Sequence, residues 1–473
     1  MKSLLSVVFL TAFVLADCLH EPVAAKQRWP NLIVIMADDL GYSDVGFNGS
    51  TDIPTPHIDS IASNGVRFSS GYTTYTVCSP SRAGLITGRY PQRFGFERNP
   101  QYRPADKNMG LPQDEQTLAD VLKERGYSTG IIGKWHLGAN REAHHPLERG
   151  FDEFFGHLGG SHRYFPHELT IKDSYSISNE GKSSRTWIMR DHKPVKVDSY
   201  LTDEFSDEAV AFIERHQGKP FFLFLSYNAP HTPLQATSKY LSRFGSIQNN
   251  KRRTYAAMVS AMDDGIGRVL QRLKALNLEK DSMIVFLSDN GGPIHNGSRN
   301  NPLRGKKGTP YEGGFRVPFA LQWPGNVKAG LVIDQPVSTL DIFATMAALC
   351  DIEINKEQPL DGLNLMPLLN GNTEAFDSRP IYLRMHDKQA FTIRRGQYKL
   401  VIPEQDSQAE LYNLNADIGE SHDLSAEQPQ LVQSLSAQLN AWADQLGTPK
   451  FKGLIHTKRR QNKFKKKSGL QLH

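Results

Sequence analysis

Four apolar segments of this 473-residue sequence are each followed closely by side chains that can bind a cation or move a proton. An acid pair after a strand is most often a turn or helix cap, and a single histidine there is most often structural. Four such endings in one chain instead indicate one polar site. The residues are Asp38 and Asp39 after the first segment, Lys134 and His136 after the second, His231 after the third, and Asp289 and Asn290 after the fourth.

Four of these side chains could together bind a metal ion through oxygen: Asp38, Asp39, Asp289 and Asn290. Carboxylate and amide oxygens are hard ligands, which suit Ca²⁺ or Mg²⁺ and disfavour zinc. Three carboxylates at short range also raise one another's pKa, so a buried cluster of them is tolerated only with a cation or with protonation. We therefore predict one bound divalent ion, Ca²⁺ with Mg²⁺ as the alternative.

Cys78 stands in a loop that leads into a short helix, with Arg82 four residues further on. A cysteine at a helix N-terminus beside an arginine is expected to have a lowered thiol pKa, which by itself predicts a thiolate nucleophile. Soft sulfur does not suit the hard cation predicted beside it. The two predictions conflict if position 78 stays a cysteine.

A parallel sheet would bring these residues together. Five short runs rich in β-branched and apolar residues, mostly separated by helical patterns, predict buried strands with helices on both faces. In such a sheet ligands bind beyond the carboxyl ends of the strands. The predicted strands are 31–37, 127–133, 221–227, 282–288 and 317–323, and the predicted helices are 114–125, 198–216, 252–276 and 339–350.

The sequence changes character after about residue 370. Closely spaced strand patterns followed by one helical pattern predict a small antiparallel sheet with a helix packed on it. These patterns lie at 381–384, 391–395, 398–402, 410–413 and, for the helix, 426–445. We therefore predict an α/β protein with a catalytic domain over 28–360, an α+β subdomain over 361–449 and a tail over 450–473.

The first residues are typical of a secretory signal peptide. Lys2 precedes the apolar stretch 4–16, which is too short to span a bilayer, and small residues follow at 23–25. We predict a signal over residues 1–25 and an exported protein, periplasmic or secreted, with no membrane span. Residues 15–18 resemble a bacterial lipoprotein box, but Asp17 directly before Cys18 fits such a box poorly.

The formal net charge of +5 is concentrated at the C-terminus. Nine of the 55 Lys and Arg residues lie from Lys450 onward, where there is no acid, so the rest of the chain has 46 basic and 50 acidic residues. The tail is interpreted either as a solvated segment or as an electrostatic tether to a polyanion. No nucleic-acid partner is predicted.

The residues around Cys78 resemble the signature of the type I sulfatases, a branch of the alkaline phosphatase superfamily. That signature, C-x-P-S-R followed by L-T-G-R, is matched by residues 78–82 and, with Ile86 for the leucine, by 86–89. Further blocks similar to the family run along nearly the whole mature chain. They are 31–41, 133–138, 229–233, 288–292, 305–318 and 410–414.

The resemblance implies an alkaline-phosphatase-like, mostly parallel sheet and a modified residue 78. In this family a formylglycine-generating maturation enzyme oxidises the cysteine to Cα-formylglycine. Its hydrate is an oxygen nucleophile that a metal can bind. Residue 78 would then join the oxygen ligands, which removes the conflict with a hard cation.

The resemblance also implies proton transfers. Asp289 would deprotonate one hydroxyl of the hydrated formylglycine, which attacks sulfur, while His231, with Lys307 nearby, protonates the leaving oxygen. His136 would take the proton of the second hydroxyl, so that sulfate is eliminated. The implied catalytic residues are Cys78, Arg82, Lys134, His136, His231 and Lys307, of which Arg82 and Lys134 hold the diol and Lys134 and Lys307 bind sulfate oxygens.

Substrate contacts are expected from the loop over residues 156–165. Ser161 or His162 in this loop is expected to touch the sulfate or the sugar. Further subsite candidates are Arg98, Arg103, Arg384 and His386.

The sequence therefore predicts a sulfatase whose substrate is a sulfated oligosaccharide or polysaccharide, such as a carrageenan-type algal galactan or a glycosaminoglycan. Two alternatives stay open. One is a formylglycine-dependent phosphonate or phosphodiester hydrolase, which would prefer aryl phosphodiesters to aryl sulfates. The other is a catalytically silent protein that binds sulfated glycans, in which residue 78 would remain cysteine.

Overall fold

The computed structural model describes residues 29–101, 106–139, 141–168 and 187–453. The predicted signal peptide lies outside these residues, as do Arg103 and the tail from residue 454 onward. Among the described helices, none combines the length and the apolar character needed to cross a membrane.

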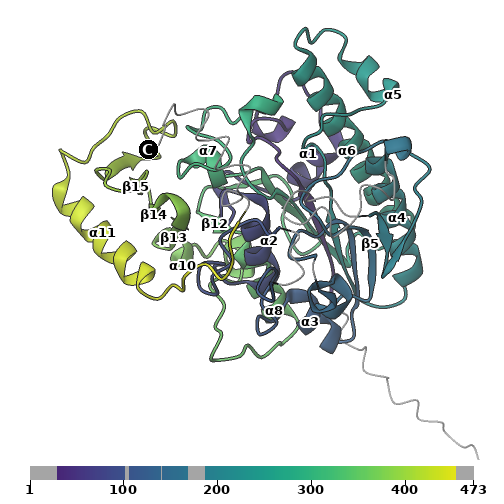
Figure 1. Cartoon of the computed structure of the whole chain (residues 1–473), viewed down its shortest axis with the longest axis horizontal. Helices are drawn as coiled ribbons and strands as arrows, with labels where there is room; N and C mark the ends of the chain where they lie inside the picture. The colour runs from purple at the N-terminus through teal and green to yellow at the C-terminus, as the bar shows by residue number, and fades with distance from the viewer. Residues whose placement is uncertain (1–28, 102–105, 140, 169–186, 454–473) are drawn as a thin grey trace, which may run out of the picture.

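A ten-stranded sheet forms the centre of the molecule (Figure 1). Its middle strands are β1 (Asn31–Ala37), β4 (Ser128–Lys134), β8 (Phe221–Ser226) and β9 (Ser282–Ser288). They lie in the order β9, β1, β8, β4, and all are parallel. Ala37 pairs with Ser288, and Met36 with Ser226, so the strands end at one level. Four predicted strands are confirmed to within one residue, and the polar residues after them meet at one edge.

The fifth predicted strand, β10 (Phe319–Gln322), is antiparallel to β9, which corrects the expected parallel arrangement at this point. An apolar run indicates burial but not direction. Only short helical turns lie between β9 and β10, so no crossover helix carries the chain back to the other end of the sheet. The sequence did not reveal the short outer strands β2 (Val66–Phe68), β11 (Leu331–Ile333), β5 (Glu153–His157), β6 (Met189–Arg190) and β7 (Lys193–Pro194).

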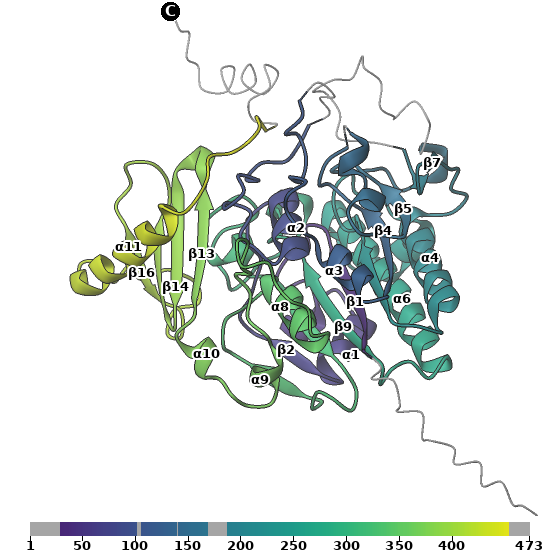
Figure 2. The same ribbon diagram turned by 90° about the horizontal axis from the view of Figure 1, so that it is seen from below.

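Alternate residues of the strands face two separate cores. In β1, Leu32 and Val34 face one core, and Ile33 and Ile35 face the other. Helices cover both faces of the sheet, as expected (Figure 2). The first core packs against α2 (Cys78–Thr87), α3 (Leu118–Glu124) and α8 (Leu340–Leu349), and the second against α1 (Pro56–Ser63), α4 (Leu201–His216) and α6 (Asn250–Ala275).

The predicted helices are confirmed, and the structure shows the capping contacts that fix their ends, which the apolar periodicity does not reveal. Helix α3 begins at Leu118 rather than at residue 114 because Thr117 and Asp120 form a capping box, each side chain accepting from the other's backbone N–H. Helix α2 begins at Cys78 itself and ends before Gly88, whose φ of +66° suits the left-handed conformation at that position.

The small C-terminal sheet is antiparallel, as predicted, with strands β13 (Pro380–Met385), β14 (Ala390–Arg395), β15 (Tyr398–Ile402) and β16 (Glu410–Asn413). Helix α11 (Pro429–Ala443) packs on it through Leu435, Leu439 and Trp442 (Figure 1). The remaining elements are β3 (Gly71–Tyr72), β12 (Val337–Ser338), α5 (Ser238–Leu241), α7 (Glu312–Phe315), α9 (Met366–Leu369) and α10 (Glu374–Asp377), with short 3₁₀ turns between them.

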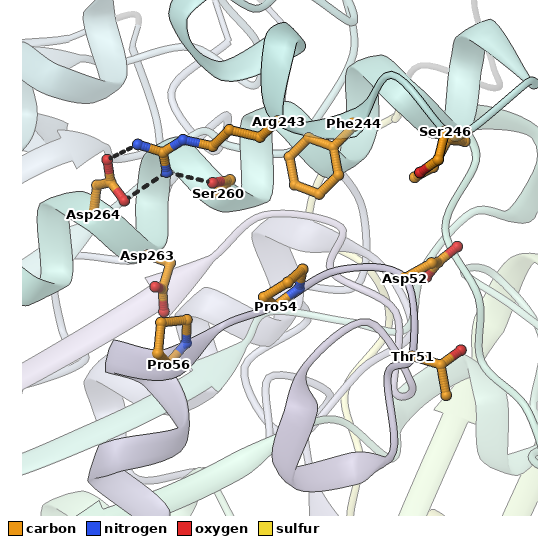
Figure 3. Close-up of a pocket in the computed structure, with 11 residues that line it drawn as sticks. Thr51, Asp52, Pro54, Pro56, Arg243, Phe244, Ser246, Ser260, Asp263 and Asp264 are labelled. Atoms are coloured by element: carbon orange, nitrogen blue, oxygen red, sulfur yellow. Dashed lines mark hydrogen bonds and ion pairs between the residues drawn. The ribbon is translucent and has the colours of Figure 1, made fainter.

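A surface cavity of about 450 Å³ separates the loop before α1 from α6 (Figure 3). Asp263 of α6 lines it and accepts the backbone N–H groups of His57 and Ile58 at 3.1 and 2.8 Å, so it caps α1 from outside. Asp263 is buried, and burial raises its pKa to about 6, above the 3.8 of an exposed aspartate. The fold therefore favours the protonated carboxyl.

This raised pKa predicts a pH-dependent stability. A raised folded-state pKa stabilises the fold at low pH, and that contribution is lost as pH rises from about 4 to above 6. We expect Asp263→Asn, which cannot ionise, to gain roughly 2–3 kcal/mol relative to the wild type between pH 4 and 7. Unfolding curves of both proteins across this range test the expectation. Identical pH dependence would contradict it.

Candidate active site

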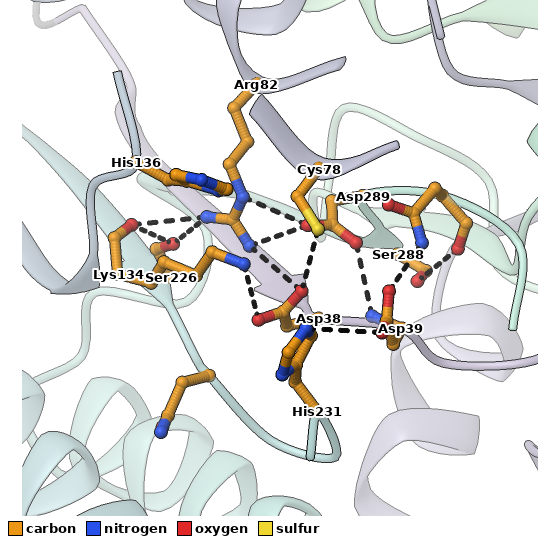
Figure 4. A network of polar contacts seen from close by, with 12 residues as sticks. Asp38, Asp39, Cys78, Arg82, Lys134, His136, Ser226, His231, Ser288 and Asp289 are labelled. Carbon is orange, nitrogen blue, oxygen red and sulfur yellow. Dashed lines mark hydrogen bonds and ion pairs between the residues drawn. The ribbon is translucent and has the colours of Figure 1, made fainter. Parts of the chain in front are cut away.

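The residues that come after the four central strands converge at the carboxyl edge of the sheet (Figure 4). Lys134, the last residue of β4, reaches across with its Nζ 2.7 Å from Asp38 Oδ2, just beyond β1. Cys78, the first residue of α2, places its Sγ 3.6 Å from Asp38 Oδ1. The ends of β1 and β4 and the first residue of α2 thus bring these three side chains together.

Arg82 lies one helical turn after Cys78 and is completely buried. Its Nε and Nη2 lie 3.0 and 2.9 Å from Asp289 Oδ2, beyond β9. Its Nη1 donates to the Lys134 carbonyl at 3.2 Å and to Ser226 Oγ at 2.5 Å (Figure 4). The Arg82 guanidinium thus bonds to residues at or just after the ends of β4, β8 and β9, and these bonds hold the start of α2 against the edge of the sheet.

Lys307 reaches the site from the long connection between β9 and β10. Its Nζ lies 2.5 Å from Asp39 Oδ1 and 3.0 Å from Cys78 Sγ. A lysine in a glycine-rich loop is most often a solvated surface residue. This one is not, because its ammonium touches the predicted nucleophile.

His231 lies on the opposite side of Asp39. Its Nε2 is 3.5 Å from Asp39 Oδ2, and its Nδ1 is 2.6 Å from the carbonyl of Thr232. Two oxygens facing the two ring nitrogens suit a doubly protonated ring. Burial lowers its pKa, and Asp38 and Asp39 oppose that effect. A proton that such a ring holds weakly is one it can donate.

His136 is positioned by its backbone. Its φ is +62°, its N–H donates to the Leu158 carbonyl at 3.2 Å, and its carbonyl accepts from Ser79 Oγ. Both ring nitrogens are buried without a hydrogen-bond partner among the described residues. Burial, reinforced by Lys134 and Arg82, holds the pKa of this ring well below its usual range. His136 is therefore neutral, so one of its ring nitrogens has a lone pair that can accept a proton.

The lowered thiol pKa expected for Cys78 is wrong for the unmodified side chain. Burial raises its pKa to about 12, because a buried thiolate loses its hydration, and the nearby Lys134 and Lys307 do not outweigh that loss. A thiol that stays protonated is a poor nucleophile, so this position does not suit chemistry by cysteine itself.

The acids differ in charge state. Burial alone would raise the pKa of Asp38, but Lys134, His231, Arg82 and Lys307 surround it and hold its pKa below its usual range. Burial and the neighbouring Asp38 raise the pKa of Asp289 to about 6. Asp38 is thus the permanent anion of the pair, and Asp289 the member that can exchange a proton near neutrality.

The oxygen donors suit a hard divalent cation. Asn290 Nδ2 donates to Asp39 Oδ1 at 2.7 Å, while Asn290 Oδ1 is buried with no hydrogen-bond partner in the described part of the chain. Asp289 Oδ1 accepts from the Asp39 N–H at 3.2 Å. An orphaned amide oxygen among carboxylates is what Ca²⁺ or Mg²⁺ would satisfy. One ligand atom from each of four residues also lies within 4.8 Å of the others: Asp38, Asp39, Cys78 and His231.

Charge alone does not require the ion, which corrects the expectation that three acids at short range need one. Each acid already has a basic partner within 3 Å: Lys134 for Asp38, Lys307 for Asp39 and Arg82 for Asp289. Three carboxylates and three cations are formally neutral. The donor set, rather than the charge, therefore favours a cation. The sequence also did not predict that His231 lies among the ligand atoms.

The predicted substrate residues lie beside the site. His162 is buried with Nδ1 3.0 Å from the Arg163 carbonyl, and its ring lies 5.3 Å from that of His157. In the same loop, a Cβ on Gly160 would lie 2.5 Å from His136 Nε2, so only glycine leaves room for that ring. Ser161, between them, is half-buried. Their contact with substrate stays a prediction.

Two of the proposed subsite arginines have structural partners instead. Arg384 is buried and pairs with Glu97, and Arg98 pairs with Asp387. These ion pairs join the C-terminal sheet to the loop after α2, which carries Asn99. Asn99 Oδ1 accepts the Ser79 N–H at 3.1 Å and so caps α2. His386, between Met385 and Asp387, is half-buried.

Sequence reasoning missed three side chains at this edge: Ser226, which holds Arg82, Asn99, which caps α2, and His157, which pairs in register with Lys134. Ser226 and His157 are the last residues of β8 and β5. A search for polar residues at the ends of strands would therefore find Ser226, and would also find His157 if β5 were predicted as a strand. Asn99 lies in an irregular loop and has no such signal.

Comparison with known proteins along the whole chain agrees with this geometry. The sulfatase family model matches residues 30–352, and the model of the N-sulphoglucosamine sulphohydrolase C-terminal region matches residues 306–445. The chain belongs to the sulfatase family, the hydrolases of sulfate esters.

Among its relatives are mouse N-acetylgalactosamine-6-sulfatase, 34% identical over 80% of this chain and 72% of the relative, and mouse arylsulfatase J, 38% identical over 73% of this chain and 56% of the relative. The solved structure of Ps i-CgsB in complex with k-i-k-neocarrahexaose has a TM-score of 0.86 and 40% identity, covering 93% of this chain and 98% of that one. The phosphonate monoester hydrolase of Agrobacterium radiobacter, at 20% identity and a TM-score of 0.65, shares the fold.

Proposed function

We propose that this protein is an exported sulfatase that removes sulfate from a sulfated carbohydrate, with a carrageenan-type galactan as the first substrate to test and a glycosaminoglycan as the second. The observation that carries the proposal is the arrangement around Cys78, where Lys307 and Asp38 touch the sulfur and a neutral His136 and a hydrogen-bonded His231 lie close by. The similarity to a structure that holds a neocarrahexaose supports the choice of galactan.

Residue 78 is proposed to act as Cα-formylglycine, made from Cys78 by a maturation enzyme. The modification would supply a hydrated aldehyde, an oxygen nucleophile with a second hydroxyl. The high thiol pKa of buried Cys78 supports this, because the unmodified residue is not suited to attack sulfur.

A divalent ion, Ca²⁺ or Mg²⁺, is proposed to be held by Asp38, Asp39, Asp289, Asn290 and residue 78. It would supply positive charge to the sulfate and to the nucleophile. Arg82, bonded to Asp289, and Lys134, bonded to Asp38, would hold the diol of the hydrated formylglycine, and the Lys134 and Lys307 ammonium groups would bind sulfate oxygens.

Three residues are proposed to move protons. Asp289, which Arg82 holds close to residue 78, takes the proton of the attacking hydroxyl. His231, assisted by Lys307, donates to the leaving sugar oxygen through Nε2, since its Nδ1 faces the Thr232 carbonyl. His136, kept neutral by burial and nearby cations, then accepts the proton whose removal lets sulfate leave.

Export and the domain boundaries are part of the proposal. The signal over residues 1–25 and the periplasmic or secreted location rest on the sequence pattern, and so does the basic tail as a tether or a solvated segment. The boundary between catalytic domain and subdomain is proposed at residue 360, within the segment between β12 and β13 that separates the mixed sheet from the small antiparallel sheet.

Turnover of defined substrates tests the function. The matured protein should release inorganic sulfate from carrageenan or glycosaminoglycan oligosaccharides and should hydrolyse an aryl sulfate faster than an aryl phosphodiester. Mass spectrometry of the peptide containing residue 78 should find the aldehyde in the active preparation. Faster phosphodiester turnover would favour the phosphonate or phosphodiester hydrolase, and binding without turnover by a protein with intact Cys78 would favour the silent glycan-binding protein.

A further inference from the structure

A buried group of charges outside the catalytic edge joins the connection that carries Lys307 to the C-terminal sheet. Lys399 of β15 has its Nζ 2.8 Å from Glu312 Oε1 and 2.7 Å from Glu420 Oε1. All three side chains are completely buried. Glu312 opens α7, shortly after Lys307 in the chain. The buried charges therefore lie close to a catalytic residue in sequence, but on the far side of its loop.

Glu420 holds both ends of the segment 304–312. Its Oε2 accepts the Glu312 N–H at 2.8 Å, and its carbonyl accepts from Arg304 Nη1 at 2.9 Å. Its φ is +51°, a conformation that costs free energy for a residue with a side chain, so its surroundings hold it there. One residue of the subdomain thus bonds to both ends of the loop.

Further contacts hold the middle of the loop. Lys388 Nζ donates to the Gly308 carbonyl at 2.6 Å, and Thr392 Oγ1 donates to the Pro310 carbonyl at 3.1 Å. On the opposite side, the Gly308 N–H donates to the Thr76 carbonyl at 2.9 Å, two residues before Cys78. The loop thus lies between the C-terminal sheet and the segment that leads to the nucleophile.

Stability alone is a weak reason for such a group. Burying an ammonium and two carboxylates costs several kcal/mol, and pairing them often does no more than offset that cost. A set of buried charges that pair with one another does, however, favour the chain geometry that keeps every member paired. Here that geometry is the path of the loop that brings Lys307 Nζ to Asp39 and Cys78.

We propose that Glu420 and Lys399 are positioning residues for Lys307, so that the C-terminal sheet takes part in catalysis by holding the 304–312 loop against the nucleophile. The inference rests on the proposed role of Lys307. Both residues are buried, so neither could contact the substrate. Their contribution to catalysis would instead be to hold the loop that carries Lys307.

A double-mutant cycle with Lys307 tests it, because a residue that acts through Lys307 has nothing to act on once that ammonium is gone. Glu420→Gln keeps the size of the side chain and removes its charge. We expect it to lower kcat/KM on the sulfated oligosaccharide about tenfold in the wild type and less than twofold in the Lys307→Met background. Full multiplication of the two losses, or no loss from Glu420→Gln, would overturn the inference.

Two further variants keep the test decisive. Lys388→Met removes an exposed side chain whose Nζ donates to the Gly308 carbonyl, so it should fold and should show a smaller loss, again absent without Lys307. Asp263→Asn is the matched control: Asp263 is also a buried acid that accepts the first N–H groups of a helix, but it lies on α6, away from the loop that carries Lys307. Its effect on kcat/KM should be small and the same in both backgrounds.

The cycle separates this inference from the proposed function. If Lys307→Met alone leaves kcat/KM unchanged, the catalytic role of Lys307 is wrong. A different outcome is a large loss in kcat/KM from Lys307→Met, with losses from Glu420→Gln and Lys388→Met that are as large in the Lys307→Met background as in the wild type. In that case Lys307 is catalytic and the positioning role of the C-terminal sheet is wrong.

Discussion

Cys78→Ala should abolish sulfate release from every substrate while leaving the melting temperature within a few degrees of the wild type. The expected loss is at least about 10⁴-fold in kcat, because the variant has no nucleophile for its basic residues to assist. The fold should tolerate the change, since alanine removes one buried sulfur and the partners of Cys78, Lys307 and Asp38, keep their other ion pairs. Circular dichroism and product assays on the same preparation check both halves.

Cys78→Ser separates the formylglycine mechanism from an ordinary nucleophile. A serine hydroxyl can attack sulfur, but the resulting ester has no second hydroxyl whose deprotonation would expel sulfate. We expect at most one turnover and a sulfated protein that intact-mass measurement detects. Sustained turnover by the serine variant, at a rate near that of the matured enzyme, would contradict the proposed chemistry.

Asp39→Asn should weaken both metal binding and activity. Asparagine suits this position because Asp39 has a φ of +67°, which asparagine tolerates better than alanine does. The change replaces a charged ligand of the proposed metal site, beside Asn290, and leaves the half-buried Lys307 ammonium without its acid. We expect a loss of about 10²-fold or more in kcat/KM, together with weaker binding of the cation.

Calcium-dependent stability measures the metal site independently of catalysis. An ion that binds only the folded state raises its stability by RT ln(1 + [L]/Kd). Melting temperature should therefore rise with added Ca²⁺ after chelation for the wild type and for the control Asp263→Asn, and should not rise for Asp39→Asn. A full Ca²⁺-dependent rise in Asp39→Asn, stoichiometric zinc in the purified enzyme, or full activity after verified metal removal would each contradict the predicted site.

The sequence alone determined the strands of the catalytic edge and most of the residues that meet there. Apolar runs at 31–37 and 282–288 coincide with β1 and β9, because burial on both faces of a parallel sheet requires continuous apolar residues. Polar residues directly after such runs are then brought together by the parallel arrangement itself. The motif around Cys78 adds the chemistry, since its similarity to a family carries information that periodicity does not.

The tertiary structure decided strand direction, burial and the partners of the charges. β10 has the apolar pattern of a parallel strand but pairs antiparallel, because the connection before it holds no crossover helix. The pKa of Cys78 rises rather than falls, because complete burial outweighs the nearby positive charges. Arg82 meets Asp289 across 207 residues of sequence, and Lys307 meets Cys78 across 229. Local patterns record which face of an element is buried, whereas the charge state of a buried group depends on neighbours that only the folded chain brings together.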